Sequence, residues 1–227
     1  MTGQMVALML LVPFYIFIAE MIPGRTVHVP ELVLDRVVPL QPVWALIYGP
    51  LYLFLILLPV FVVRQDTHIR RTFSAYLTVW TIAYVCFLLF PTKASRPPSV
   101  IGQGFAAWGL RFLYSADPPY NCFPSLHVAH SFVSALTCWR VHRGVGLAAL
   151  LCATVVAIST LFRKQHYVLD VLAGSLLACA AYAVWLRPCP PPPRLERRLA
   201  PLLACSVLAI VAVALACFWV VYRYVST

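Results

Sequence analysis

An apolar stretch without a charged side chain fills residues 43–63 and reads VWALIYGPLYLFLILLPVFVV. A transmembrane helix needs about 20 mostly apolar residues, so this stretch is long enough to cross a bilayer as one helix. The same criterion gives further candidates along the chain, and the full set of predicted spans is 4–22, 43–63, 72–90, 124–140, 145–162, 167–186 and 201–222. The sequence therefore predicts an all-α fold, a polytopic membrane helix bundle.

The composition excludes a soluble globular domain. Of the 227 residues, 62% are hydrophobic and 11% are charged, whereas soluble domains contain about 25% charged residues. A water-soluble core could not bury that much apolar surface. Disordered chains are excluded as well, because they are polar and poor in apolar residues.

A run of prolines at 188–193, broken by Cys189, divides the chain. Such a run cannot be helical and indicates a stiff polyproline spacer. We expect a six-span catalytic core over residues 1–187, a Pro-rich cytoplasmic linker over 188–200 and one extra C-terminal transmembrane helix over 201–227. The first span lacks a charged n-region and a small-residue cleavage site, which favours a retained helix over a signal peptide.

Arginine is concentrated in the loops around 64–71, 140–143 and 187–198. The positive-inside rule places these loops in the cytoplasm. The N-terminus is then cytoplasmic, and the 91–123 loop faces the periplasm or another extracytoplasmic compartment. The net charge of +10 is explained by this orientation and by an anionic, phosphate-bearing ligand. No basic stretch with interleaved aromatic residues suits base stacking, so a nucleic-acid partner is not expected.

Three short segments hold most of the polar side chains near the outer surface. The first, 91–98, contains Lys93 and Arg96. Lysine supplies a point charge and arginine a planar fork that binds phosphate bidentately. The alternative is an ordinary interfacial loop whose cations reach toward the membrane surface.

The second segment, 121–130, contains Pro124, Ser125 and His127. Proline and serine suit the first turn of a helix, where free backbone N–H groups and the helix dipole attract anions. His127 would then lie at the helix start and could act as a general acid or base. The alternative is a structural histidine at a helix end.

The third segment, 159–170, ends with His166 and Asp170. Residues four apart share one face of a helix, and a carboxylate inside an apolar span is costly unless it holds a partner. An imidazole oriented by a carboxylate is suited to nucleophilic attack. Because the predicted topology brings all three segments to one side of the membrane, the sequence predicts an active site there.

A metal site is the competing interpretation of the same residues. His127, His130, His166 and Asp170 could form a set of three histidines and one carboxylate. The neighbouring cations would repel a divalent ion; they are Lys93, Arg96, Arg163 and Lys164. We therefore expect no metal and no other cofactor. The eight cysteines show no metal-binding spacing, and a disulfide framework is not expected.

The three segments together resemble the type 2 phosphatidic acid phosphatase superfamily, which also includes haloperoxidases and lipid phosphotransferases. The matching motifs are Lys…Arg-Pro at Lys93, Arg96 and Pro97; Pro-Ser-x-His at Pro124, Ser125 and His127; and His-x-x-x-Asp at His166 and Asp170. The spacing from Lys93 to Arg96 is shorter than is usual. Leu126 stands where glycine is common, and Ser159-Thr160 stands where Ser-Arg is common, which leaves Arg163 or Lys164 to replace that arginine.

Residues 123–127 (FPSLH) and 164–167 (KQHY) are most similar to the inositol phosphorylceramide synthase-like branch, which transfers a phospho-headgroup between lipids. The resemblance implies that His166 forms a phosphohistidine, Asp170 holds its ring and His127 protonates the leaving alkoxide. It also implies phosphate binding, for which the candidates are Lys93, Arg96, Ser125, the backbone N–H of residue 126, Arg163 and Lys164.

We thus expect a metal-independent lipid phosphatase that acts on a lipid phosphomonoester or diphosphate. The nearest alternative is a phosphotransferase that passes the group to a lipid alcohol acceptor. A membrane transporter is a further alternative, because intramembrane histidine and aspartate also mark proton relays.

Overall fold

The computed structural model of the chain describes residues 2–225, with side chains described from residue 10 onward except at residue 12. Over that range all regular secondary structure is helical, which confirms the all-α class. The strand-like pairings within it are two isolated bridges, His28 with Thr92 and Lys93 with Tyr120.

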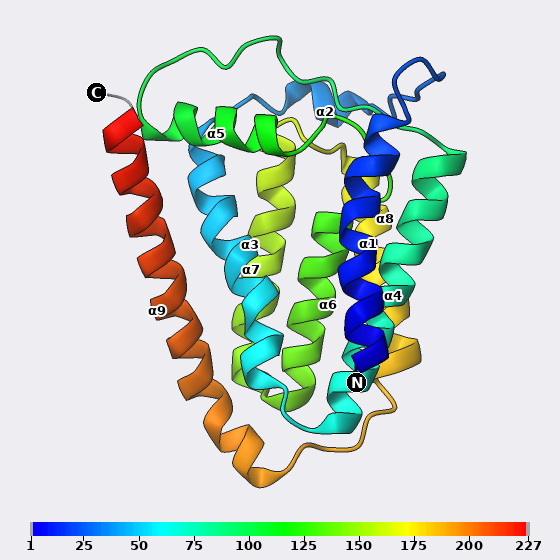
Figure 1. Cartoon of the computed structure of the whole chain (residues 1–227), viewed down its shortest axis with the longest axis vertical. Coiled ribbons are helices and arrows are strands. Elements are labelled where there is room, and N and C mark those ends of the chain that lie inside the picture. The colour runs from blue at the N-terminus through cyan, green and yellow to red at the C-terminus, as the bar shows by residue number, and fades with distance from the viewer. Residues whose placement is uncertain (1, 226–227) are drawn as a thin grey trace.

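Long helices run side by side between two ends of the molecule (Figure 1). They are α1 (Thr2–Glu20), α3 (Val43–Val62), α4 (Asp66–Leu89), α6 (Leu126–Val141), α7 (Arg143–Phe162), α8 (Val168–Ala181), which continues into the π-helical turn η1 (Tyr182–Leu186), and α9 (Arg194–Val225). The shorter helices α2 (Val33–Val37) and α5 (Phe105–Ala116) lie at the upper end in Figure 1.

Within the described residues, five helices are long and apolar enough to cross a membrane: α3, α4, α7, α8 with η1, and α9. They indicate an integral membrane protein. Helix α6 has 16 residues, so it is about 24 Å long and shorter than the hydrocarbon core of about 30 Å. The number of spans therefore stays a prediction.

Helix α6 is the centre of the bundle, since it packs against α3, α4, α7 and α8. Its small side chains allow close approach, as is common between membrane helices. At the α6–α7 contact, a Cβ atom on Gly146 would lie 2.2 Å from the Cα atom of Trp139. Glycine at 146 is therefore required for these two helices to lie this close.

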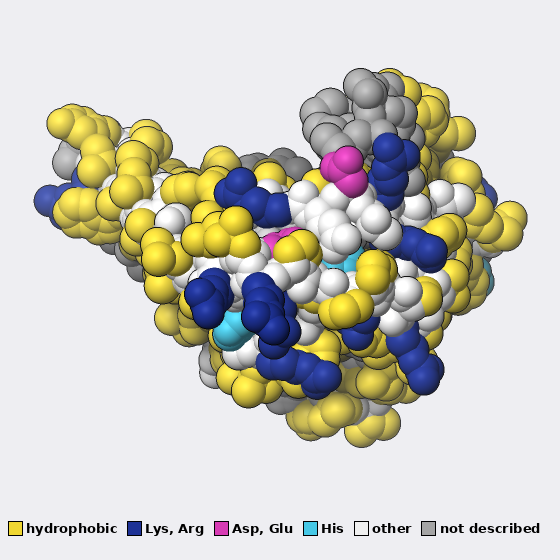
Figure 2. Space-filling view, turned by 90° about the horizontal axis from the view of Figure 1, so that it is seen from below, with side chains coloured by type: hydrophobic (Ala, Val, Ile, Leu, Met, Phe, Trp, Pro, Cys, Tyr) yellow, Lys and Arg dark blue, Asp and Glu magenta, His cyan; other side chains and the backbone are white. Residues whose placement is uncertain are grey.

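The two ends of the bundle differ in chemistry. The connections at 63–65, 142 and 187–193 lie at the lower end in Figure 1, and the segments at 91–98, 117–125 and 163–167 lie toward the upper end. Figure 2 looks onto the lower end and shows several groups of Lys and Arg side chains. This arrangement agrees with the predicted loop topology, while the membrane side of each end stays a prediction.

Two elements differ from the expected boundaries. Helix α9 begins at Arg194, within the stretch expected as linker, because the proline run stops at Pro193 and good helix formers such as Leu195 follow. Helix α5 was not predicted, because its 12 residues are too few for a span. It lies across the top of α3 and α9 (Figure 1).

The close α6–α7 contact predicts that Gly146→Ala destabilises the bundle. Overpacking a contact of this kind costs typically about 1–3 kcal/mol, so we expect a lower melting temperature in detergent. Gly49→Ala on α3 is the matched control, since a Cβ atom there meets no atom within 4 Å. Its melting temperature should be unchanged or raised. Equal melting temperatures for the two variants would contradict the described packing.

Candidate active site

Two histidines from different segments meet at the upper end of α6. Nδ1 of His127, in the first turn of α6, lies 3.2 Å from Nε2 of His166, which precedes α8. The structure thus brings together the two imidazoles that the sequence singled out. Both side chains are largely shielded, with 16% of His127 and 3% of His166 exposed.

The protonation of His166 follows from its partners. Its Nδ1 lies 3.1 Å from the carbonyl oxygen of Cys122 and 3.5 Å from Oδ2 of Asp170. Both neighbours accept hydrogen bonds, so the tautomer with its proton on Nδ1 fits this place, and Nε2 of that tautomer carries a lone pair. His127 must then donate from Nδ1 in the contact between the two rings. The unprotonated Nε2 of His166 therefore faces a proton donor, Nδ1 of His127.

The sequence predicted that His166 and Asp170 share one face of a helix, and the structure differs. His166 lies in the turn before α8, and Asp170 is in the first turn of that helix. Oδ2 of Asp170 accepts the backbone N–H of Tyr167 at 2.8 Å. A carboxylate in the first turn is stabilised by the helix dipole, which offsets part of the cost of burying it.

The starts of α6 and α8 are joined directly. The backbone N–H of Ser125 donates to the carbonyl oxygen of Asp170 at 3.0 Å. A Cβ atom on Gly174 of α8 would lie 2.5 Å from the carbonyl oxygen of Ser125, so glycine permits this approach. Ser125 also caps α6, because its Oγ accepts the N–H of Val128 at 3.4 Å.

Arg163 is the most deeply buried cation of the site. Its side chain is fully buried, its guanidinium carbon lies 3.6 Å from the ring centre of Tyr48, and none of its three nitrogen atoms has a hydrogen-bond partner among the described residues. Burial lowers the pKa of this guanidinium, but arginine stays charged at neutral pH. An anion with several oxygen atoms would satisfy these donors.

Arg96 is positioned by backbone oxygens of the loop after α5. Its Nη1 donates to the carbonyl oxygen of Asp117 at 2.6 Å and its Nη2 to that of Pro118 at 3.2 Å. The guanidinium also lies over the ring of Tyr114, 4.6 Å from its centre. These contacts fix the plane of Arg96, while Nε has no partner among the described residues.

Neither of the two candidate lysines, Lys164 and Lys93, offers a buried, unpaired donor. Lys164 Nζ donates to the carbonyl oxygen of Asp35 at 2.7 Å, and the side chain lines a small cavity that His166 and Tyr167 also line. Lys93 is exposed, and its Nζ lies 5.8 Å from the ring centre of Tyr120. Of the two candidates for the missing motif arginine, Arg163 is the one whose donors are buried and unpaired.

Asp117 belongs to the site, although sequence reasoning missed it. Its carboxylate accepts hydrogen bonds from Tyr15 Oη at 2.8 Å and from the amide of Gln165. Oδ2 also lies 3.8 Å from Arg96 Nη2 and 4.0 Å from His127 Nε2. The residue follows α5 at no motif spacing, so the sequence carried no signal for it.

Asp35 of α2 is a second missed residue. Its Oδ1 accepts the backbone N–H of Val168, the first residue of α8, at 2.9 Å. The short helix α2 therefore caps α8 from outside, and Asp35 and Asp170 both place negative charge at the start of α8.

The three histidines and one carboxylate that the sequence offered as a metal site do not come together among the described residues. His130 stacks on Tyr76 with ring centres 4.5 Å apart, within the α4–α6 packing. Among the described residues, the ligand atoms that cluster are those of Cys122, His166 and Asp170, within 4.8 Å of one another. Burial raises the pKa of the Cys122 thiol, which disfavours the thiolate that metals bind.

The fold and the site together define an all-helical membrane protein with a paired histidine centre, the buried Arg163 and the half-buried Arg96. A family model described as the PAP2 superfamily matches residues 27–184, and the chain belongs to this superfamily. The match covers the paired histidines and both arginines, and it ends before α9.

A relative with a curated description is a PA-phosphatase related-family protein of Dictyostelium discoideum. It is 25% identical over 120 residues, which are 48% of this chain and 22% of the relative. The chain thus spans about a fifth of that protein's length. The comparison with solved structures gives no significant match.

The buried guanidinium predicts how the site binds an anion. Orthovanadate, a phosphate analogue, should raise the melting temperature of the wild type. Arg163→Met should weaken this binding about tenfold or more, because a charge-assisted hydrogen bond contributes about 1.5–3 kcal/mol. Arg36→Met is the matched control and should bind within about twofold of wild type, because the Arg36 side chain is 71% exposed and an exposed charge contributes little. Comparable weakening in both variants would contradict the described geometry.

Proposed function

We propose that this chain is a lipid phosphatase that hydrolyses a lipid phosphomonoester or diphosphate through a phosphohistidine, without a metal ion. The observation that carries the proposal is the nitrogen pair of His166 and His127, with an unpaired, buried Arg163 nearby. Membership of the PAP2 superfamily and the relative named as PA-phosphatase related support an enzyme that acts on phosphoesters of lipids.

In the first step, the lone pair of His166 Nε2 attacks phosphorus. A P–N bond forms, the P–O bond to the lipid breaks, and His127 gives its Nδ1 proton to the departing oxygen. Asp170 stabilises the ring of His166 as it gains positive charge. In the second step His127 takes a proton from water, the water oxygen attacks phosphorus, and the P–N bond breaks to release phosphate.

The remaining residues stabilise the transition state. Arg163 and Arg96 would bind the equatorial phosphoryl oxygens, and the free N–H groups in the first turn of α6, which Ser125 caps, would add donors. To act as the acid His127 must carry a proton on both ring nitrogens, and Asp117 Oδ2, 4.0 Å from His127 Nε2, would interact favourably with that charge. Lys164 and Lys93 would assist at the rim, where a diphosphate would extend.

The two imidazole rings must separate for this chemistry. The 3.2 Å contact between the two rings occupies the place of the phosphoryl group. Binding therefore requires the His127 side chain to rotate away from His166, while the partners of Nδ1 keep His166 in place.

A phosphotransferase is the second candidate, favoured by the likeness of residues 123–127 and 164–167 to the inositol phosphorylceramide synthase-like branch. It would use the same phosphohistidine, or a phosphodiester headgroup, with a lipid alcohol in place of water. A transporter is less well supported. The titratable residues described above gather at one end of the bundle, whereas a proton relay would extend through the membrane.

We also propose that the active site opens on the extracytoplasmic face and that the N-terminus is cytoplasmic. The support is the arginine-rich opposite end (Figure 2), which the positive-inside rule places in the cytoplasm.

The function is tested with purified protein in detergent and EDTA, given phosphorus-labelled phosphatidic acid and an isoprenoid diphosphate. We expect wild type to release labelled inorganic phosphate and His166→Ala to release none, because no other side chain in the described part of the chain has an oriented free nitrogen at this place. His142→Asn is the matched control. It changes the histidine that caps α7 at the opposite end to another good cap, and it should keep full activity.

Hydrolysis and transfer are separated by adding diacylglycerol or ceramide, with labelled phosphatidylinositol as a further donor. Label found as inorganic phosphate supports the phosphatase. Label found on the added alcohol supports the transferase and makes hydrolysis a side reaction. Equal activity of His166→Ala and wild type would overturn both.

A further inference from the structure

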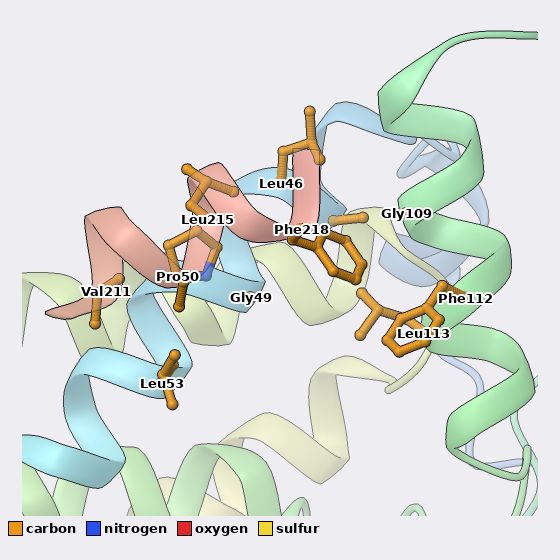
Figure 3. A pocket seen from close by; sticks show the side chains of 12 residues that line it. Leu46, Gly49, Pro50, Leu53, Gly109, Phe112, Leu113, Val211, Leu215 and Phe218 are labelled. Atoms are coloured by element: carbon orange, nitrogen blue, oxygen red, sulfur yellow. The ribbon is translucent and has the colours of Figure 1, made fainter. Parts of the chain in front are cut away.

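An apolar pocket of about 300 Å³ lies between α3, α5 and α9. Figure 3 shows side chains from all three helices around it. Every residue that lines it is apolar or glycine: Ala45, Leu46, Gly49, Pro50, Leu53, Gly109, Phe112, Leu113, Val211, Ala214, Leu215 and Phe218. Polar or charged ligand groups would find no partner there, whereas a hydrocarbon chain would.

The pocket adjoins the arginine of the active site through two tyrosines. On α3, Tyr48 precedes the lining residue Gly49, and its ring lies 3.6 Å from the guanidinium carbon of Arg163. On α5, Tyr114 follows the lining residue Leu113, and its hydroxyl donates to the carbonyl oxygen of Arg163. The same two helices thus form a wall of the pocket and the surroundings of Arg163.

Aromatic contacts join α5 and α9 beside the pocket. The ring centres of Trp108 and Phe218 are 4.7 Å apart, and those of Phe112 and Phe218 are 5.1 Å apart. Phe105 and Tyr222 add a further contact at 5.1 Å. These rings hold α9 against α5, so the α9 wall of the pocket is fixed in place.

We propose that this pocket binds the hydrocarbon tail of the lipid whose phosphate occupies the site at His166 and Arg163. The inference rests on the proposed function and adds the part of the substrate that the phosphate chemistry leaves open. An amphiphile with an anionic head and an apolar tail matches both neighbouring features at once, the unpaired guanidinium and the apolar pocket.

Helix α9 then selects substrates by the shape of the tail. Inside a bilayer, transfer of a tail from lipid to protein gains little from the hydrophobic effect, so packing in the pocket decides which tails fit. The α9 residues Val211, Ala214, Leu215 and Phe218 lie outside the matched residues 27–184. The α9 wall of the pocket therefore lies outside the matched residues, whereas the walls from α3 and α5 lie within them.

The test is photocrosslinking of the full-length protein in detergent. The probe is a phosphatidic acid analogue with a diazirine in one acyl chain, and the control probe is the matching diacylglycerol. We expect the phosphate-bearing probe to label peptides containing residues 211–218 and unlabelled phosphatidic acid to compete. Label elsewhere, or equal label there from the diacylglycerol, would overturn the proposal.

Two neighbouring positions on α9 supply matched variants. Ala214 lines the pocket, and Val213 is 64% exposed on the outer face of α9. Ala214→Phe should lower labelling of 211–218 about tenfold by filling the space, whereas Val213→Phe should leave it unchanged. Gly49→Leu fills the pocket from α3, where a Cβ atom meets nothing within 4 Å, and should have the same effect as Ala214→Phe.

The labelling requires binding but no turnover, so it separates this proposal from the proposed function. Labelling of 211–218 without any phosphate release would support the pocket and contradict the phosphatase. Phosphate release from the same probe, with labelling unaffected by Ala214→Phe and Gly49→Leu, would support the phosphatase and overturn the pocket.

Discussion

The contacts of Asp170 are the constraint on which the site depends. Its carboxylate accepts the N–H of Tyr167 at the start of α8 and faces Nδ1 of His166, and its backbone carbonyl accepts the N–H of Ser125 at the start of α6. One fully buried residue therefore sets the orientation of one imidazole and the position of the helix that carries the other. A buried carboxylate is costly without such partners.

The site also holds a buried positive charge, which costs free energy because burial removes the charge from water. Arg163 is fully buried without a hydrogen-bond partner among the described residues, and its guanidinium carbon lies 3.6 Å from the ring centre of Tyr48. A fold that keeps such donors unpaired is preorganised for an anion, because binding a phosphoryl group restores the interactions lost on burial. Burying Arg163 without hydrogen-bond partners lowers the stability of the fold, and this cost is consistent with a role of Arg163 in function.

The class of fold and the pairing of His127 with His166 could be predicted from the sequence. Apolar stretches long enough to span a membrane predict the helix bundle. His127, His166 and Asp170 stand at spacings that local helix geometry brings toward one end of the bundle. The sequence alone could not separate Arg163 from Lys164. Their side chains diverge because Lys164 adopts a left-handed backbone conformation with φ of 54°, a local turn that no spacing reveals.

Asp117 and Asp35 could not be predicted for a different reason. Asp35 lies in the short helix α2 and Asp117 directly follows the short helix α5. Both reach the site through contacts with residues far away in the sequence, as in the hydrogen bond between Asp35 and Val168. The sequence correctly predicted that the side chains of His166 and Asp170 lie close together. The prediction that they share one helix face was wrong, because His166 lies before α8. Their contact forms across the N-terminus of α8, where Asp170 also receives a backbone N–H.

The central claim is that His166 Nε2 attacks phosphorus, and trapping the phosphorylated enzyme tests it most directly. Protein mixed with phosphorus-labelled lipid phosphate would be denatured in alkali within the first turnover and its peptides analysed by mass spectrometry. The account predicts one phosphoryl group on the peptide containing His166, stable in alkali and lost in acid as a phosphoramidate is, and absent from His166→Ala. Phosphate release with the label on another residue, or with His166→Ala fully active, would contradict it.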